Sequence, residues 1–301
     1  MTTLDRQTSA AGAVADAAPP VAAKVAMLTA VAMLAFAANS VLCRLALAHT
    51  AIDPATFTLV RILSGAATLC LLAMTASKER RIGGDWSAAV ALLAYAAAFS
   101  FAYVSLAAGT GALLLFGAVQ ATMIVTGLIR GERLAPAQWA GLAMASAGLV
   151  VLVAPGVSAP PPFSSALMLV AGAAWGAYSL LGRRSSTPPL AATAGNFLRA
   201  SPLALLLALP MVGSLTPDPM GLLYAVLSGA LASGVGYAIW YAALPGLSAA
   251  RAASVQLSVP AITAVGGALM LGETITMRLA LASAAILGGI ALVIVGKIRR
   301  A

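Results

Sequence analysis

The chain is poor in the residues on which enzymes and metal sites depend. Its 301 residues include one histidine, two cysteines and eight acidic residues, and charged residues of both signs make up only 8%. With so few nucleophiles, acids and metal ligands, a transmembrane enzyme is not expected, and no metal ion or other cofactor is predicted. Cys43 and Cys70 lie inside apolar segments and form neither a disulfide framework nor a metal-binding spacing.

The low content of charge also excludes a soluble fold. Soluble domains carry about 25% charged residues, whereas this chain is 61% hydrophobic with a mean hydropathy of +1.00. A soluble core of this composition would leave large apolar patches facing water. The composition therefore predicts an integral membrane protein whose main partner is the lipid bilayer.

Ten apolar segments fill nearly all of the chain. A run of 18 or more apolar residues can cross the hydrocarbon core of about 30 Å as a helix. Changes in hydropathy and the positions of proline and glycine predict spans at 24–48, 54–76, 86–107, 110–129, 136–154, 163–183, 190–212, 219–243, 248–271 and 277–297. The predicted fold is an all-α bundle of ten transmembrane helices.

The net charge of +9 is explained by the orientation of the chain in the membrane and does not indicate a nucleic-acid partner. Of the 17 basic residues, 13 fall in the tails or in alternate loops, on the side that would hold both termini. Because cytoplasmic loops are rich in Lys and Arg, both termini are predicted to be cytoplasmic in a bacterial inner membrane. The segment 1–23 lacks the apolar region of a signal peptide and is interpreted as a disordered cytoplasmic tail, and 298–301 as a short basic tail.

The second five spans repeat the first five. Arg130-Gly131-Glu132 opens the fifth span, and Leu271-Gly272-Glu273 opens the tenth, 141 positions later. Arg61 in the second span likewise corresponds to Arg199 in the seventh. The predicted domains are two five-helix repeats, 24–154 and 163–297, joined by a periplasmic proline-rich linker, 155–162. Since five is odd, the repeats must have inverted topology, the plan of many secondary transporters. A single chain of this kind suffices to enclose a pathway.

With these features in place, the chain resembles the ten-helix drug/metabolite transporter superfamily. The resemblance rests on the five-plus-five layout, the two Gly-Glu steps and the first-span segment Phe36-Ala37-Ala38-Asn39-Ser40, which recurs as Trp175-Gly176-Ala177-Tyr178-Ser179. Within the superfamily it is similar to the amino-acid and metabolite exporter branch, and most of all to bacterial aromatic amino acid exporters. This resemblance implies export of amino acids by alternating access.

Aromatic and amide side chains inside the spans are the candidate substrate-binding groups. Tyr and Trp combine apolar area with a polar group, and amides can bind both the carboxylate and the ammonium of a zwitterion. The same residues could instead be packing groups or interhelical hydrogen-bonding groups. The predicted substrate-binding set is Asn39, Tyr103, Gln120, Trp175, Tyr178, Arg199, Trp240, Tyr241 and Gln256.

The two arginines inside spans need partners, because a guanidinium in hydrocarbon costs at least about 2.5–3.5 kcal/mol on insertion scales. Arg61, about eight residues from a helix end, could extend its head group to the membrane surface. Arg199 lies deeper, and either backbone carbonyls or a substrate carboxylate could bind it. Glu132 and Glu273 are expected to stabilise the first turns of the fifth and tenth helices.

No acidic residue falls in the middle of a predicted span. Proton-coupled carriers usually place a titratable group there, so the sequence favours facilitated transport or exchange. The alternative is multidrug or other metabolite efflux by proton antiport, in which Glu132 or the substrate carries the proton.

Overall fold

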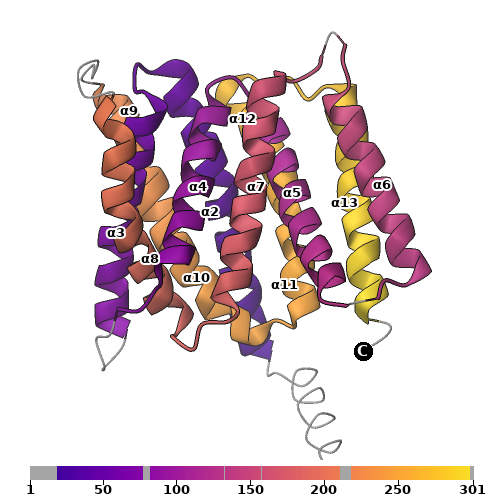
Figure 1. Ribbon diagram of the computed structural model, residues 1–301, viewed down its shortest axis with the longest axis horizontal. Helices are drawn as coiled ribbons and strands as arrows, with labels where there is room; N and C mark the ends of the chain where they lie inside the picture. The colour runs from indigo at the N-terminus through magenta and orange to yellow at the C-terminus, as the bar shows by residue number, and fades with distance from the viewer. Residues whose placement is uncertain (1–18, 77–81, 132, 157, 211–217, 299–301) are drawn as a thin grey trace, which may run out of the picture.

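The computed structural model describes residues 19–76, 82–131, 133–156, 158–210 and 218–298, and they form one helical bundle (Figure 1). The described residues contain ten stretches that are long and apolar enough to cross a membrane, and no strand. The all-α, ten-span fold predicted from hydropathy is therefore confirmed. The elements are α2 (Pro19–His49), α3 (Pro54–Ala76), α4 (Trp86–Tyr103), α5 (Ala108–Ile129), α6 (Pro136–Val153), α7 (Pro162–Gly182), α8 (Pro189–Ala208), α9 (Pro219–Val226), η2 (Leu227–Val235), α10 (Gly236–Ala243), η3 (Leu244–Gly246), α11 (Ala249–Gln256), α12 (Ser258–Leu271) and α13 (Met277–Ile298).

Proline and acidic residues determine where many of the helices begin. Six α-helices start at proline: α2, α3, α6, α7, α8 and α9. Proline has no backbone N–H, and this costs nothing at a helix start because first-turn N–H groups have no acceptor within the helix. Asp53, Asp85 and Asp218 cap α3, α4 and α9, because each carboxylate accepts from backbone N–H groups of the first turn. These acidic residues are thus used in defining helix ends.

The helix bounds differ from the predicted spans where the backbone departs from regular α-helix. The first helix begins at Pro19 and not near 24, and the seventh ends at Ala208 and not near 212. The eighth span contains the π-helical segment η2. The ninth is interrupted at Leu257, because Pro260 has no N–H to bond the carbonyl one turn earlier. The predicted tail up to residue 18, Glu132 and residues 299–301 lie outside the described part of the chain.

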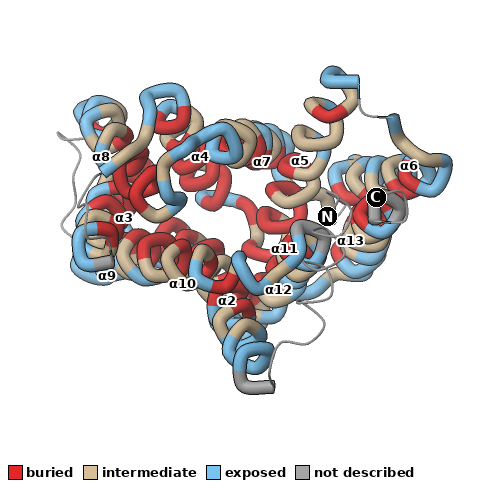
Figure 2. The backbone as a smooth tube through the Cα atoms, turned by 90° about the horizontal axis from the view of Figure 1, so that it is seen from below, coloured by how far each residue is buried: buried red, intermediate tan, exposed pale blue. Residues whose placement is uncertain are grey.

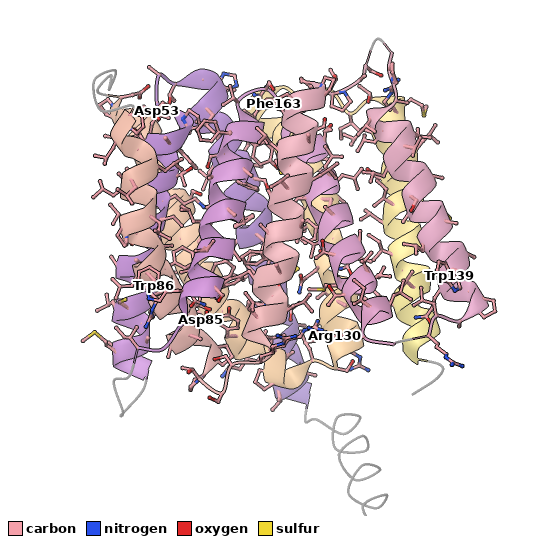
Figure 3. All side chains as sticks on the ribbon, viewed as in Figure 1. Asp53, Asp85, Trp86, Arg130, Trp139 and Phe163 are labelled. Carbon is pink, nitrogen blue, oxygen red and sulfur yellow. The ribbon has the colours of Figure 1, made fainter. Side chains whose placement is uncertain are left out.

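Successive spans run in opposite directions between two faces. We call the face that holds Pro19 and Ile298 the terminal face, and the other the far face (Figure 1). Figure 3 places Asp53 and Phe163 at the far face and Trp86 and Trp139 at the terminal face. Both tryptophans are exposed, which is typical of aromatic side chains at a membrane–water interface.

Packing between α2–α6 and α7–α13 follows a reciprocal pattern. The first helix of the second half, α7, packs on α4 and α5, and the first helix of the first half, α2, packs on the corresponding α10 and α12 (Figure 2). The two remaining equivalent pairs, α3 with α8 and α6 with α13, pack on each other. Exchanging the halves therefore leaves these main pairings unchanged.

Small residues allow the pair α6 and α13 to approach closely. A Cβ added at Gly141 would lie 2.5 Å from the Gly289 carbonyl oxygen, and one at Gly289 would meet the Gly141 carbonyl oxygen. Close backbone contact of this kind is a common basis of helix association in lipid. The aromatic interior is formed elsewhere, by α2, α4, α7, α8 and α10.

Candidate functional site

The interior of the bundle is a continuous network of aromatic rings. Neighbouring centroids lie from 4.7 Å (Phe99 to Tyr103) to 6.5 Å (Tyr237 to Tyr241) apart. The rings belong to five helices and are Phe36, Tyr95, Phe99, Tyr103, Trp175, Tyr178, Phe197, Tyr237, Trp240 and Tyr241. Of these, Tyr103, Trp175, Tyr178, Trp240 and Tyr241 were predicted binding residues, so the structure brings the aromatic part of the predicted set into one region.

Trp175 lies at the centre of this network. Its ring is 4.8 Å from Tyr95, and it stacks on Tyr178 at 5.2 Å and on Tyr237 at 5.6 Å. These contacts join α7 of the second half to α4 of the first half and to α10. A planar substrate ring would find offset-stacking partners here, since aromatic pairs favour centroid separations of about 4.5–7 Å.

A buried polar cluster adjoins the rings where α2, α3, α4 and η2 meet. Asn39 Nδ2 donates to the Tyr95 hydroxyl at 3.3 Å, and Arg61 Nη2 donates to the same oxygen at 2.9 Å. Ser228 Oγ donates to Asn39 Oδ1 at 2.6 Å. Arg61 is 1% exposed, so its head group does not extend to the membrane surface, a role that the sequence left open for it. The side chain is held inside by the Tyr95 hydroxyl and by the faces of Tyr95 and Phe99.

A second polar cluster lies nearer the terminal face, between α7, α8 and α10. Thr193 Oγ1 and the Tyr241 hydroxyl are 2.8 Å apart, and the Tyr178 hydroxyl donates to the same Thr193 oxygen at 3.5 Å. Asn196 Nδ2 donates to the Tyr178 hydroxyl at 3.4 Å, while its Oδ1 accepts from the Asp85 backbone N–H at 2.9 Å. This cluster links two predicted binding residues to the segment that precedes α4.

Arg199 lies at the edge of this region. Its Nη1 donates to the backbone carbonyls of Gly83, at 2.6 Å, and Gly195, at 3.1 Å. Of the two roles left open by the sequence, the structure shows pairing with carbonyls, and it joins the segment before α4 to α8.

The remaining predicted residues lie apart from the polar clusters. Gln120 on α5 and Gln256 at the end of α11 are half-buried, and their amides have no hydrogen-bond partner within the described residues. Tyr103 is fully buried at the far-face end of α4, where its hydroxyl donates to the Ala108 carbonyl at 3.1 Å.

Glu273 does not cap its own helix as predicted. It lies between α12 and α13, and its Oε2 accepts from the Ala108 N–H, at the start of α5, at 2.7 Å. Its Oε1 pairs with Arg44 Nε at 3.1 Å. The helix-end role is therefore retained, but for a helix of the other half, because the loop folds over α5.

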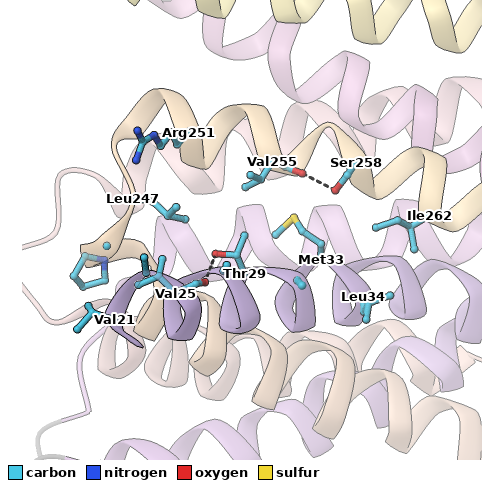
Figure 4. A pocket seen from close by; sticks show the side chains of 15 residues that line it. Val21, Val25, Thr29, Met33, Leu34, Leu247, Arg251, Val255, Ser258 and Ile262 are labelled. Carbon is cyan, nitrogen blue, oxygen red and sulfur yellow. Dashed lines mark hydrogen bonds between the residues drawn. The ribbon is translucent and has the colours of Figure 1, made fainter. Parts of the chain in front are cut away.

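A pocket of about 850 Å³ opens between the first half of α2 and α11–α12, toward the terminal face (Figure 4). Its walls are mainly apolar, with Val21, Val25 and Leu247 at one end and Leu34 and Ile262 at the other (Figure 4). Met33, which lines it, packs in a buried cluster with Trp240 and Val259. The pocket therefore reaches the periphery of the aromatic region.

Sequence reasoning left several interior residues outside the predicted site. Tyr95 and Phe99 share the four-residue spacing of Tyr103, but their depth could not be judged without neighbours. Tyr237 lies four residues before Tyr241 and so shares its helix face. No sequence pattern predicted the pocket, because its walls are mainly ordinary aliphatic residues from spans that are far apart in the sequence.

Ten apolar spans around an interior of aromatic and polar side chains define a multi-pass membrane protein of the transporter class. Residues 163–295 match the model of the EamA-like transporter family. The chain is 56% identical over 276 residues to "Uncharacterized protein PA1977" of Pseudomonas aeruginosa, covering 91% of this chain and 96% of that one. A solved structure, titled "Crystal structure of protein", shares the fold with a TM-score of 0.65 at 19% identity, over 93% of this chain and 99% of that one. The chain belongs to the EamA-like transporter family and is a membrane transporter of small metabolites.

Proposed function

We propose that this transporter exports amino acids, aromatic and other neutral ones, across a bacterial inner membrane. The observation that carries the proposal is the interior network around Trp175, which brings ring faces together with hydroxyl and amide groups. Ring faces suit an apolar side chain, and amides and hydroxyls suit the charged backbone groups of an amino acid.

We also propose that transport proceeds by alternating access between two inverted repeats, 24–154 and 163–297. The reciprocal packing of α2 and α7 on their partners supports this plan, since a pseudo-two-fold axis relates inverted repeats in many transporters. The described basic residues Arg130, Arg183 and Arg251 lie at the terminal face, which supports a cytoplasmic assignment for that face and for both termini.

The two faces differ in how they are closed. At the far face, Arg44 donates to the Tyr103 and Val104 carbonyls and pairs with Glu273, which holds the start of α5. Toward the terminal face, the pocket beside α2 opens between the helices. This combination supports a state that is closed to the periplasm and accessible from the cytoplasmic side, as the uptake step of an exporter requires.

We propose facilitated transport without ion coupling. The described acidic residues Asp53, Asp85 and Asp218 cap helices, and Glu273 lies in a loop, so none is placed within a span for proton relay.

The test is uptake of a labelled panel of Phe, Trp, Thr, Met and Lys into proteoliposomes without an imposed ion gradient. The proposal expects saturable equilibration of several members and no accumulation above the external concentration. If none of the panel is taken up by folded protein, amino-acid export is excluded. Accumulation driven by a pH gradient would instead support the proton-coupled alternative.

A further inference from the structure

The guanidinium of Arg61 is a buried positive charge without an anionic partner among the described residues. The side chain is fully buried on α3, seven residues after the helix begins at Pro54. Only Nη2 has a hydrogen-bond acceptor, the Tyr95 hydroxyl at 2.9 Å, whereas Nε and Nη1 are buried without one. Because a guanidinium carries five N–H donors, most of its hydrogen-bonding capacity is unused.

Ring faces account for part of this environment but supply no negative charge. The Arg61 carbon Cζ lies 5.2 Å from the Tyr95 centroid and 4.9 Å from that of Phe99, within the range of cation–π attraction. Throughout the described ranges the ion pair is Arg44 with Glu273, at the far face. The described carboxylates Asp53, Asp85 and Asp218 occupy helix N-termini, where backbone N–H groups bind them. Arg61 thus has no anion among them.

The other intramembrane arginine lacks this property. Arg199 donates to two carbonyls, those of Gly83 and Gly195, and it is only half-buried. The sequence treats Arg61 and Arg199 as equivalent positions of a repeat, but the structure separates their roles. One guanidinium is bound by the backbone, and the other keeps donors for a group that is not part of the chain.

The groups around Arg61 form a site at the depth of the membrane midplane. Asn39 lies ten residues before the end of α2, and Ser228 nine residues after the start of α9. At about 1.5 Å per residue this is close to half of the hydrocarbon thickness of about 30 Å. Asn39, Tyr95 and Ser228 converge there from three elements and are joined by hydrogen bonds beside the Arg61 guanidinium.

An irregular helix covers one side of this site. Ser228 lies in η2, and π-helical segments occur frequently at functional sites. Gly229 of η2 packs directly on the backbone of α3, where an added Cβ would meet the Arg61 carbonyl. The π-helical segment η2 therefore lies directly against α3 beside the enclosed guanidinium.

We propose that Arg61 binds the carboxylate of the transported substrate, so that the anionic end docks at Arg61 while an apolar side chain stacks in the network around Trp175. Arginine and carboxylate form strong charge-assisted hydrogen bonds, which would occupy the unused donors. The inference rests on the proposed function for its amino-acid substrate, but it requires only that the ligand carry a carboxylate.

The first measurement compares two ligands on the purified full-length protein. Thermal unfolding is followed with 3-phenylpropanoate, which keeps the carboxylate of phenylalanine, and with phenethylamine, which keeps only the amine. Stabilisation by the acid at a concentration about tenfold or more below that needed for the amine is expected. Equal stabilisation by both, or none by the acid, overturns the proposal.

Variants then assign the effect to the side chain. Arg61→Gln should abolish stabilisation by 3-phenylpropanoate without lowering the unfolding temperature of the free protein, because it removes a buried charge that lacks an anionic partner. The matched control is Arg278→Gln, which removes a guanidinium that donates to the Ala154 carbonyl at the far face. It should retain the response to the acid. A response kept by Arg61→Gln, or lost equally in the control, contradicts the assignment.

Two further comparisons keep the test decisive. Should Arg61→Gln not fold, Arg61→Lys, which preserves the charge but not the planar fork, is expected to weaken stabilisation by the acid. Should the amino-acid panel show no uptake while 3-phenylpropanoate still stabilises the protein through Arg61, the amino-acid export function fails and the carboxylate site stands. If amino acids are taken up but 3-phenylpropanoate does not stabilise the protein, the export function stands and the carboxylate site at Arg61 fails.

Discussion

Glu273 connects the loop between α12 and α13 to the start of α5, because its Oε2 accepts from the Ala108 N–H at 2.7 Å. Its Oε1 pairs with Arg44 on α2, whose Nη1 also reaches the carbonyls that end α4. One carboxylate thus joins both halves of the chain at the far face. A charged hydrogen bond of this kind contributes about 1.5–3 kcal/mol.

Glu273→Gln is expected to loosen the far face, because the neutral amide cannot pair with Arg44 and is a weaker acceptor for Ala108. A single cysteine at Leu106, which is fully buried, would report the change in a background lacking Cys43 and Cys70. Its labelling by a water-soluble maleimide should become severalfold faster. As a control, Thr274→Val alters an exposed neighbour and should leave the labelling rate unchanged. Equal rates in Glu273→Gln and the parent would show that the pair does not close this face.

Trp175→Ala should impair stability and transport together. It removes three ring contacts at the centre of the network, with Tyr95, Tyr178 and Tyr237, and such truncations cost about 3–5 kcal/mol. Trp175→Phe keeps a ring and should retain most of the stability. In the uptake assay, Trp175→Phe is expected to raise the KM for phenylalanine more than that for threonine, because only the former substrate stacks. A uniform change in both would argue for a packing role alone.

Arg199→Gln is expected to lower the thermal stability of the protein without changing its discrimination between acid and amine ligands. The substitution weakens the bonds to the Gly83 and Gly195 carbonyls, which join the segment before α4 to α8. Charge-assisted bonds contribute about 1.5–3 kcal/mol each, so a loss of several degrees in unfolding temperature is expected. If Arg199→Gln instead abolished the response to 3-phenylpropanoate, the separation of roles between the two arginines would be wrong.

The contact between the Asp218 carboxylate and the Ala51 backbone at the far face should be sensitive to acid. Hydrogen bonds from the Gly221 and Ala51 backbone N–H groups lower the pKa of this carboxylate from its ordinary value. Because the folded-state pKa is the lower one, the stabilisation is present above the ordinary pKa and is lost as the pH falls through the lowered value.

The measurement compares the unfolding temperatures of the wild type and Asp218→Asn across this range. The wild type should be the more stable near neutral pH, and the difference should shrink as the solution is acidified below about pH 4, where carboxylates ordinarily gain a proton. A difference that does not depend on pH would mean that the carboxylate charge contributes nothing to the contact.

The sequence alone was sufficient for the number, type and approximate bounds of the spans. Lipid offers no partner to backbone N–H and C=O groups, so each long apolar segment has to be a helix, and hydropathy locates it. The residues that interrupt regular helix were harder to place. A proline inside a span, such as Pro260, is visible in the sequence and can interrupt a helix. The π-helical segment around Ser228 has no such marker, since its hydrogen-bond register depends on how it packs against α3.

The sequence predicted only part of the candidate site, because it does not show how the helices pack on one another. The position of Tyr103, Trp175 and Tyr241 inside predicted spans was enough to select them, because aromatic side chains with a polar group suit a binding cavity. It could not show that Tyr95 lies at the junction of the rings and the polar cluster, since that depends on which helix faces which.

The sequence by itself determined that this protein is an all-α membrane protein of ten spans, because composition and hydropathy restrict a chain in lipid to very few folds. Only the tertiary structure decided what its few charges do. Arg61 and Arg199 occupy corresponding positions along the chain, yet one is enclosed with unused donors and the other is bound by carbonyls. Glu273 caps a helix that lies 165 residues earlier in the chain. Such roles depend on distances between helices, and the order of residues along one helix carries no information about those distances.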